Sequence, residues 1–366
     1  MVALAVLAVA VFAWDRWGGP ATSASAIVST APAVRSGESG RPAGSWVGSP
    51  LPGPAGAGAS ANFLRPVSAA KQTASSLARD FANATQYKPL LDRLNGTAEG
   101  NTPEGQYYLY QILRACATVS DRKGGGNWAS ARAAQLEERR QLIATEVAEN
   151  DARRSQRLAA IEQLSTDKCA GINGITMTES ELSQLLRNSL AGGDPKARAT
   201  TIEQEVWRER RGSGPEGRAG GTLSDAQVAS LRETLASRDP EALVIAGRVL
   251  SGSFRDATVR LGPDQEPVDA RAFGAAALLL ACEYGYPCGA NNTRVLSACA
   301  YQGQCGATTL ADYLFYYGAS PYEAQAMDRY RNLLRQAADS GDWSVLTVQR
   351  GARSPNAPPL GWPPPR

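Results

Sequence analysis

Apolar and polar positions follow a helical period through most of the chain between Asn62 and Trp343. Apolar residues recur every three or four positions in segments such as Tyr107–Ala117 and Ala129–Val147, whereas the strict alternation of a half-buried strand is nearly absent. This pattern predicts an all-α fold with little or no strand.

Local signals mark where several helices begin. Thr102 followed by Pro103 is a favourable start, because the missing N–H of proline is not needed at the first helical position. Capping boxes, in which a hydroxyl residue is followed three positions later by Glu or Gln, predict further starts. They pair Thr178 with Glu181, Ser224 with Gln227, and Ser320 with Glu323.

Two charged amphipathic segments, Ala129–Val147 and Asp151–Leu164, lie next to each other in the chain. They predict either a long antiparallel helix pair that packs on its own core or an arm that binds a partner. The polar stretch Ala148–Arg157 argues against a true coiled coil, which needs an unbroken apolar seam.

Three segments of the chain match one another: Leu185–Pro195, Ser230–Pro240 and Leu333–Trp343. Each has a helix end with Leu-Arg, a short turn, and an Asp that can cap a following helix. The first two copies are 45 residues apart, a spacing found in two-helix repeats. Pro103 heads a candidate diverged earlier copy.

At these residues, over roughly Thr178–Leu346, the chain resembles Sel1-like and tetratricopeptide-type helical repeats. The resemblance implies stacked helical hairpins, in an irregular α-solenoid-like arrangement, and a role in scaffolding or protein binding. The expected Tyr and Gly pattern inside each unit is not kept, and the third copy is irregularly spaced. The block of paired cysteines between Cys282 and Cys305 is also similar to uncharacterised exported proteins of Gram-negative bacteria.

The amino-terminal stretch Val2–Trp14 is almost wholly apolar. It is shorter than the roughly 20 residues of a typical membrane span, so residues 1–17 are predicted to be either a membrane anchor or a cleaved signal segment. Residues 18–61 are rich in Gly, Pro, Ser and Ala and predict a disordered linker. The further predicted divisions are a helical subdomain at 62–172, a helical-repeat subdomain at 173–347 and a disordered Pro-rich tail at 348–366.

The six cysteines predict three disulfides in an exported protein. Two loops of equal length, with five residues between their cysteines, favour local bridges, which leaves a long-range pair. The preferred pairing is Cys282 with Cys288, Cys299 with Cys305, and Cys116 with Cys169. The alternative joins Cys282 to Cys305 and Cys288 to Cys299. A structural zinc site is disfavoured, because paired zinc ligands usually have two to four residues between them.

Composition removes several classes of function. The chain has no histidine, which excludes Ser-His-Asp and Cys-His catalysis and every metal site that needs His. Its net charge of +3 is too small to indicate a nucleic-acid partner. Nothing in the sequence indicates a cofactor or a metal.

Two kinds of candidate site remain. Glu283, with Asp312 and Glu323 further along, offers the carboxylic acid that a peptidoglycan hydrolase or lyase needs. Tyrosines gather near the cysteine loops and predict either core packing or a binding surface, since Tyr is favoured at interfaces. The surface candidates are Tyr284, Tyr286, Tyr301, Tyr316 and Tyr317.

The sequence therefore favours a non-enzymatic module that binds a protein partner in the bacterial cell envelope. We expect it to be periplasmic and held at the inner membrane through its amino-terminal segment. An enzyme that acts on peptidoglycan through Glu283 is the alternative.

Overall fold

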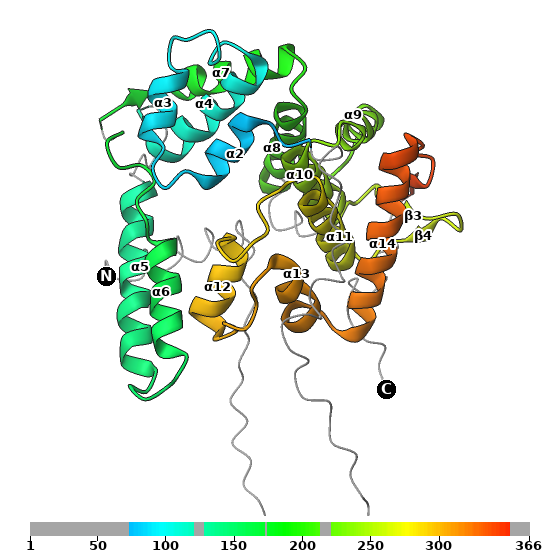
Figure 1. Ribbon diagram of the computed structural model, residues 1–366. Helices are drawn as coiled ribbons and strands as arrows, with labels where there is room; N and C mark the ends of the chain where they lie inside the picture. The colour runs from blue at the N-terminus through cyan, green and yellow to red at the C-terminus, as the bar shows by residue number, and fades with distance from the viewer. Residues whose placement is uncertain (1–72, 121–127, 173, 213–220, 352–366) are drawn as a thin grey trace, which may run out of the picture. The chain divides into compact units, whose positions relative to one another are not determined.

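The computed structural model describes residues 73–120, 128–172, 174–212 and 221–351 (Figure 1). The predicted anchor or signal segment, the predicted linker and residues 352–366 of the predicted tail lie outside the described residues. Within the described ranges, none of the helices has the length and apolar character needed to cross a membrane.

The described part of the chain is mostly helical, as the sequence predicts. The first helices are α2 (Ser76–Asn83), α3 (Lys88–Leu94), α4 (Pro103–Cys116), α5 (Trp128–Glu146), α6 (Arg154–Leu164), α7 (Glu179–Ala191) and α8 (Pro195–Gly212). They are followed by α9 (Asp225–Ala236), α10 (Pro240–Leu250), α11 (Ala270–Glu283), α12 (Thr293–Gln302), α13 (Leu310–Asp312), the π-helix η4 (Tyr313–Gly318) and α14 (Pro321–Ser340).

The predicted helix starts are confirmed. Thr102 caps α4 by accepting a hydrogen bond from the Gly105 N–H, and Pro103 is its first residue. The three predicted capping boxes all form at their predicted residues and open α7, α9 and α14. These starts are predictable because each depends on contacts within four residues of the chain.

Among the residues that the structure describes, buried apolar side chains form three clusters. The largest brings together α8 to α11, α14 and a small sheet, around residues such as Leu243 and Phe273. A second joins α2, α3, α4 and α7 around Tyr107, Tyr108 and Ile112. The third is small and lies between the α5–α6 pair and α12.

The segments at 129–147 and 151–164 form an antiparallel helix pair, α5 and α6, which Figure 1 shows side by side. Ile161 of α6 is fully buried in the cluster shared with α12. Nε of Arg157 donates a hydrogen bond of 3.0 Å to the Ala300 carbonyl oxygen on α12. The pair therefore packs within its own chain, as the first of the two interpretations requires.

The described part contains few strands, and all of them are short, which agrees with the prediction of little strand. A three-stranded antiparallel sheet, in the order β4-β3-β5, is formed by β3 (Ala257–Leu261), β4 (Glu266–Pro267) and β5 (Leu346–Arg350). Two further short strands, β1 (Thr118–Val119) and β2 (Thr176–Met177), pair in parallel. In β3 the side chains are alternately buried and half-buried, so a short alternation was present in the sequence.

The preferred disulfide pairing is confirmed, and all six cysteines are bonded. Cys116 at the end of α4 bonds to Cys169 after α6, across 53 positions of sequence. The pairs Cys282–Cys288 and Cys299–Cys305 each close a short local loop. Because disulfides persist in oxidising compartments, these bonds point to an extracellular or periplasmic environment.

The repeated Asp residues do not all play the same part. Oδ1 of Asp194 accepts hydrogen bonds from two N–H groups at the start of α8, and Asp239 caps α10 in the same way. Asp342 accepts from the Ser344 N–H in a turn, after Gly341 in the left-handed conformation ends α14, and strand β5 follows. The third copy is therefore a helix end without a following helix.

Candidate functional site

Glu283, the predicted acid, is buried with 6% of its surface exposed. Its Oε2 accepts a hydrogen bond of 2.6 Å from Nε of Arg335 on α14, and a second nitrogen of that guanidinium contacts Oε1. Nε of Arg331 lies 3.7 Å from Oε1. This forked geometry is that of a structural ion pair, and it turns both carboxyl oxygens toward arginine. Glu283 therefore joins α11 to α14 and is not placed to protonate a substrate.

The two accompanying carboxylates also have structural partners. Asp312 and Glu323 are the third residues of α13 and α14, where each completes the capping box that opens its helix. Although burial opposes ionisation of Asp312, hydrogen bonds from Thr308 and Thr309 lower its pKa. The hydrogen bond from the Ser320 backbone lowers the pKa of Glu323. Both groups therefore favour the ionised form, whereas a general acid must hold a proton near neutral pH.

The tyrosines proposed as a surface divide into three groups by exposure. Tyr284 is 1% exposed and belongs to the core, so it is removed from the predicted surface. Tyr286 and Tyr301 are half-buried, and the guanidinium of Arg139 lies 4.7 Å from the ring centre of Tyr301. Tyr316 and Tyr317 in η4 are 53% and 44% exposed.

Tyr322 is the most exposed of the large apolar side chains among the described residues, at 74%. It lies in the first turn of α14, two residues after its cap Ser320. Sequence reasoning left it out of the predicted surface, although it lies only five positions beyond Tyr317. Three exposed tyrosines, Tyr316, Tyr317 and Tyr322, thus lie within seven positions of the chain, at η4 and the start of α14, and we call them the tyrosine surface.

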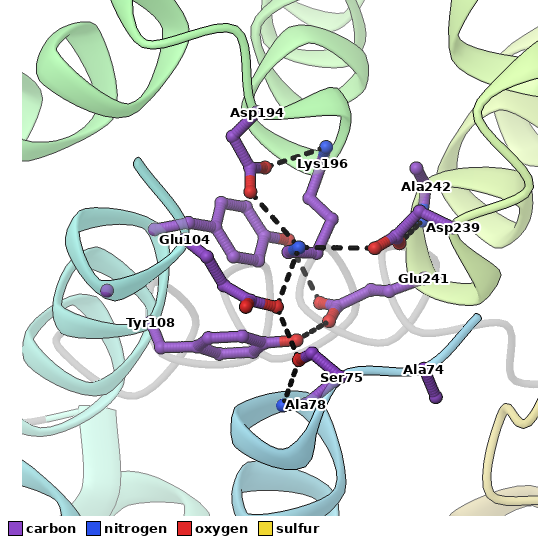
Figure 2. A network of polar contacts seen from close by, with 12 residues as sticks. Ala74, Ser75, Ala78, Glu104, Tyr108, Asp194, Lys196, Asp239, Glu241 and Ala242 are labelled. Carbon is purple, nitrogen blue, oxygen red and sulfur yellow. Dashed lines mark hydrogen bonds and ion pairs between the residues drawn. The ribbon is translucent and has the colours of Figure 1, made fainter. Parts of the chain in front are cut away.

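The structure also reveals a buried polar cluster that the sequence analysis did not predict, centred on Lys196 of α8 (Figure 2). Lys196 has 2% of its surface exposed. Its Nζ lies 3.1 Å from Oδ2 of Asp194, 3.2 Å from Oδ2 of Asp239 and 3.2 Å from Oε1 of Glu104. Each of these carboxylates lies at the start of a helix, so one ammonium joins α4, α8 and α10.

A fourth helix start reaches the same cluster. Ser75, the cap of α2, accepts a hydrogen bond from the Ala78 N–H and donates one of 2.6 Å to Oε1 of Glu104. Helix starts carry partial positive charge, which attracts carboxylates and repels an ammonium group. The carboxylates therefore make this convergence of helix starts favourable, and Lys196 in turn offsets their mutual repulsion.

Glu241 completes the lower part of the cluster in Figure 2. Its Oε1 accepts a hydrogen bond of 2.9 Å from the Tyr107 hydroxyl, and its Oε2 accepts one of 3.0 Å from the Tyr108 hydroxyl. Both tyrosines come from α4, so Glu241 joins α10 to α4. Nε2 of Gln111 donates to the Tyr107 hydroxyl at 2.6 Å, which fixes the direction of that hydroxyl.

The environment shifts several pKa values in this cluster. Burial raises the pKa of Glu241 to about 7, and the nearby charge of Asp239 adds to this effect. Burial also raises the pKa of Asp194 and of both tyrosines. Burial alone would lower the pKa of Lys196, but the surrounding carboxylates outweigh it and raise that pKa. Lys196 is therefore charged at neutral pH.

The cluster is not a metal centre. No group of three or more acidic or Cys side chains in the described ranges is arranged to hold a metal ion. Its hydrogen-bond donors and acceptors largely satisfy one another, which is typical of a buried network that fixes the packing of helices. One signal in the sequence could have located it: Glu104, Lys196 and Glu241 are all second residues of helices that begin with proline.

Comparison of the chain with known proteins identifies no relative. No family model matches the chain, and neither do any of the curated proteins or solved structures. The function must therefore be argued from the described residues.

Proposed function

We propose that this chain is a non-enzymatic module that binds a protein partner in the bacterial cell envelope. The observation that carries the proposal is the tyrosine surface, in which three large side chains are 44% to 74% exposed. Exposed tyrosines are favoured at interfaces because each offers a large apolar ring, a hydroxyl for hydrogen bonding and few rotatable bonds.

The backbone beneath the tyrosine surface is well anchored, which favours binding. η4 follows the capping box formed by Thr309 and Asp312. A side chain at Gly306 would lie only 2.6 Å from the Tyr317 hydroxyl, so this hydroxyl packs against the backbone of the loop after Cys305. That loop follows directly on the Cys299–Cys305 disulfide. A preorganised surface loses less conformational entropy when a partner binds.

The location is part of the proposal. The disulfides support an oxidising compartment, which for a bacterial chain with an apolar amino-terminal segment is the periplasm. Anchoring at the inner membrane through residues 1–17 would place the tyrosine surface within the envelope. Packing between neighbouring helices in sequence, such as α8 with α9 and α10 with α11, supports a stacked arrangement of helical hairpins.

The proposal is tested by site-specific photocrosslinking in living cells. A photoreactive residue replaces Tyr316 or Tyr322 in the full chain, and the matched control replaces Leu142, an apolar residue of α5 that is 50% exposed. We expect one discrete protein adduct from both tyrosine positions and none from the control position.

Two results would overturn the proposal. The first is the absence of an adduct at both tyrosine positions while the disulfide-bonded chain is present in the envelope. The second is cleavage of purified peptidoglycan by the full chain that is lost in E283Q, since that would make the chain an enzyme.

A further inference from the structure

Arg271, the second residue of α11, lies at the junction between η4 and α14. One of its terminal nitrogens donates a hydrogen bond of 3.2 Å to the Gly318 carbonyl oxygen, and the other lies 3.1 Å from Oε1 of Glu323. Gly318 directly follows Tyr317, and Glu323 directly follows Tyr322. One guanidinium therefore connects the backbone of η4 with the start of α14, between the two parts of the tyrosine surface.

The guanidinium of Arg271 is exposed although its position is fixed. Its side chain is 77% exposed, and its two contacts use only part of a group that has five N–H donors. Glu323 is half-buried, and its Oε2 accepts a hydrogen bond of 2.8 Å from the Ser320 N–H. Because Arg271 is held in advance, it loses little conformational entropy when it pairs with a group of a partner.

The remainder of this region carries no charge. Residues 313–322 contain neither acidic nor basic side chains, so Arg271 and Glu323 set the charge at its edge. Arg271 is the more exposed member of this pair, and the charge that a partner meets beside the aromatic rings is therefore positive. Interfaces place opposite charges together, which favours a partner that offers a negative group at this point.

We propose that the tyrosine surface and Arg271 together bind a segment of the partner in which an Asp or Glu lies next to an apolar residue. This inference rests on the proposed function and names the chemistry of the partner. The carboxylate pairs with the guanidinium of Arg271, a combination that gives strong and directional hydrogen bonds. The apolar side chain packs on the exposed rings of Tyr317 and Tyr322.

Two other occupants fit these observations less well. Residues 352–366 of the chain are rich in proline but contain no Asp or Glu, so they supply no side-chain carboxylate. An anionic lipid surface is usually recognised by clusters of about four to eight Lys and Arg, whereas residues 313–322 contain none. An acidic peptide segment needs only one well-placed cation.

The proposal is tested with the purified full chain and a phage-displayed library of short random peptides. Peptides selected on the wild type should be enriched in Asp or Glu beside apolar residues, and R271Q should bind them about tenfold more weakly or worse. R329Q is the matched control, because Arg329 is also an exposed arginine paired with a glutamate, and it should bind as the wild type does. Selection without acidic enrichment, or equal binding to R271Q, overturns the proposal.

E323Q separates pairing with the partner from a purely structural role of Arg271. Glutamine can still complete the capping box of α14, but the carboxylate that competes for Arg271 is gone. We therefore expect E323Q to bind the selected peptides about two- to threefold more tightly than the wild type. If E323Q instead weakens binding as R271Q does, Arg271 only holds η4 to α14, and the proposal is wrong.

The crosslinking experiment in cells keeps this inference apart from the proposed function. The adduct formed at position 322 should be lost in R271Q and kept in R329Q. An adduct that persists in R271Q leaves the binding function intact and overturns the role of Arg271. If no peptide is selected and R271Q abolishes binding to phosphatidylglycerol vesicles, the surface belongs to a lipid and the proposal also fails.

Discussion

At the scale of single residues, the ammonium of Lys196 lies where local rules disfavour it. It is the second residue of α8, at a helix start whose partial positive charge repels a cation. It is also almost fully buried, which is costly for a charged group without partners. The carboxylates of Glu104, Asp194 and Asp239 remove both difficulties. A residue in conflict with its local position is thus explained by contacts with two other helices.

K196M should therefore be strongly destabilising. The substitution keeps the volume of the side chain but leaves three carboxylates without their shared cation, and breaking a buried ion pair in this way costs about 3–5 kcal/mol. Urea unfolding followed by circular dichroism measures the loss. The control is K88M, which removes an exposed pair with Asp92 and should cost about 1 kcal/mol or less. Equal small losses in the two variants would show that Lys196 has no such role.

At the scale of elements, the success of sequence reasoning depended on how local each signal was. The starts of α4, α7, α9 and α14 were predictable because their caps lie within four residues of the groups they satisfy. Strand β3 was missed because it has only five residues and its longest pairing is with β5, more than eighty positions later. An alternation of that length carries little weight without a known partner strand.

The buried cluster was missed for a similar reason. The sequence analysis identified the repeated Asp-Pro starts, which became the caps of α8 and α10. It did not compare the residues that directly follow these prolines. Lys196 follows Pro195 and is positively charged, whereas Glu241 follows Pro240 and is acidic. Tertiary packing decides which helix starts lie close together. The charges in the sequence show which side chains would attract one another, but they do not show which of them come into contact. The exposed tyrosines likewise depended on burial, which the residue types alone do not determine.

The contact between α10 and α11 gives a prediction at this scale. A side-chain carbon at Gly247 of α10 would lie 2.3 Å from Cβ of Ala277 on α11, so the two helix backbones approach closely there. G247A should therefore destabilise the chain by about 1–3 kcal/mol through overpacking, despite the better helix propensity of alanine. Thermal unfolding measures this.

The matched control for that substitution is G274A on α11. A side-chain carbon at Gly274 would lie 3.1 Å from the hydroxyl of Ser251 and 3.3 Å from its Cβ, so a shift of a few tenths of an ångström would relieve both contacts. We expect G274A to be close to neutral. If G247A is as stable as G274A, the two helices are not held together by the small size of Gly247.

At the scale of the whole described chain, the long-range disulfide between Cys116 and Cys169 closes a loop that contains the α5–α6 helix pair. Cys116 and Cys169 enclose the α5–α6 pair, and β1 and β2 pair close to the two cysteines. The bond therefore ties both ends of the helix pair to the cluster of α2, α3, α4 and α7, which contains both cysteines. Helix α6 of the pair also packs on α12, and the Cys299–Cys305 loop lies at the end of α12. The helix pair is thus held at two places by elements that are distant in sequence.

Replacing both Cys116 and Cys169 by alanine should lower the melting temperature more than replacing either local pair. The long-range bond spans 53 positions and the local bonds span 6 each. By the loop-closure relation, the entropy removed from the unfolded chain corresponds to about 4 kcal/mol for the first bond and about 2 kcal/mol for each of the others. Calorimetry without reductant compares the three double variants, none of which leaves an unpaired thiol. The C282A/C288A variant is the closest control, because its bond lies beside the core without closing a long loop. A loss in that control equal to the loss in C116A/C169A would mean that strain or core packing, and not chain entropy, decides what each disulfide contributes.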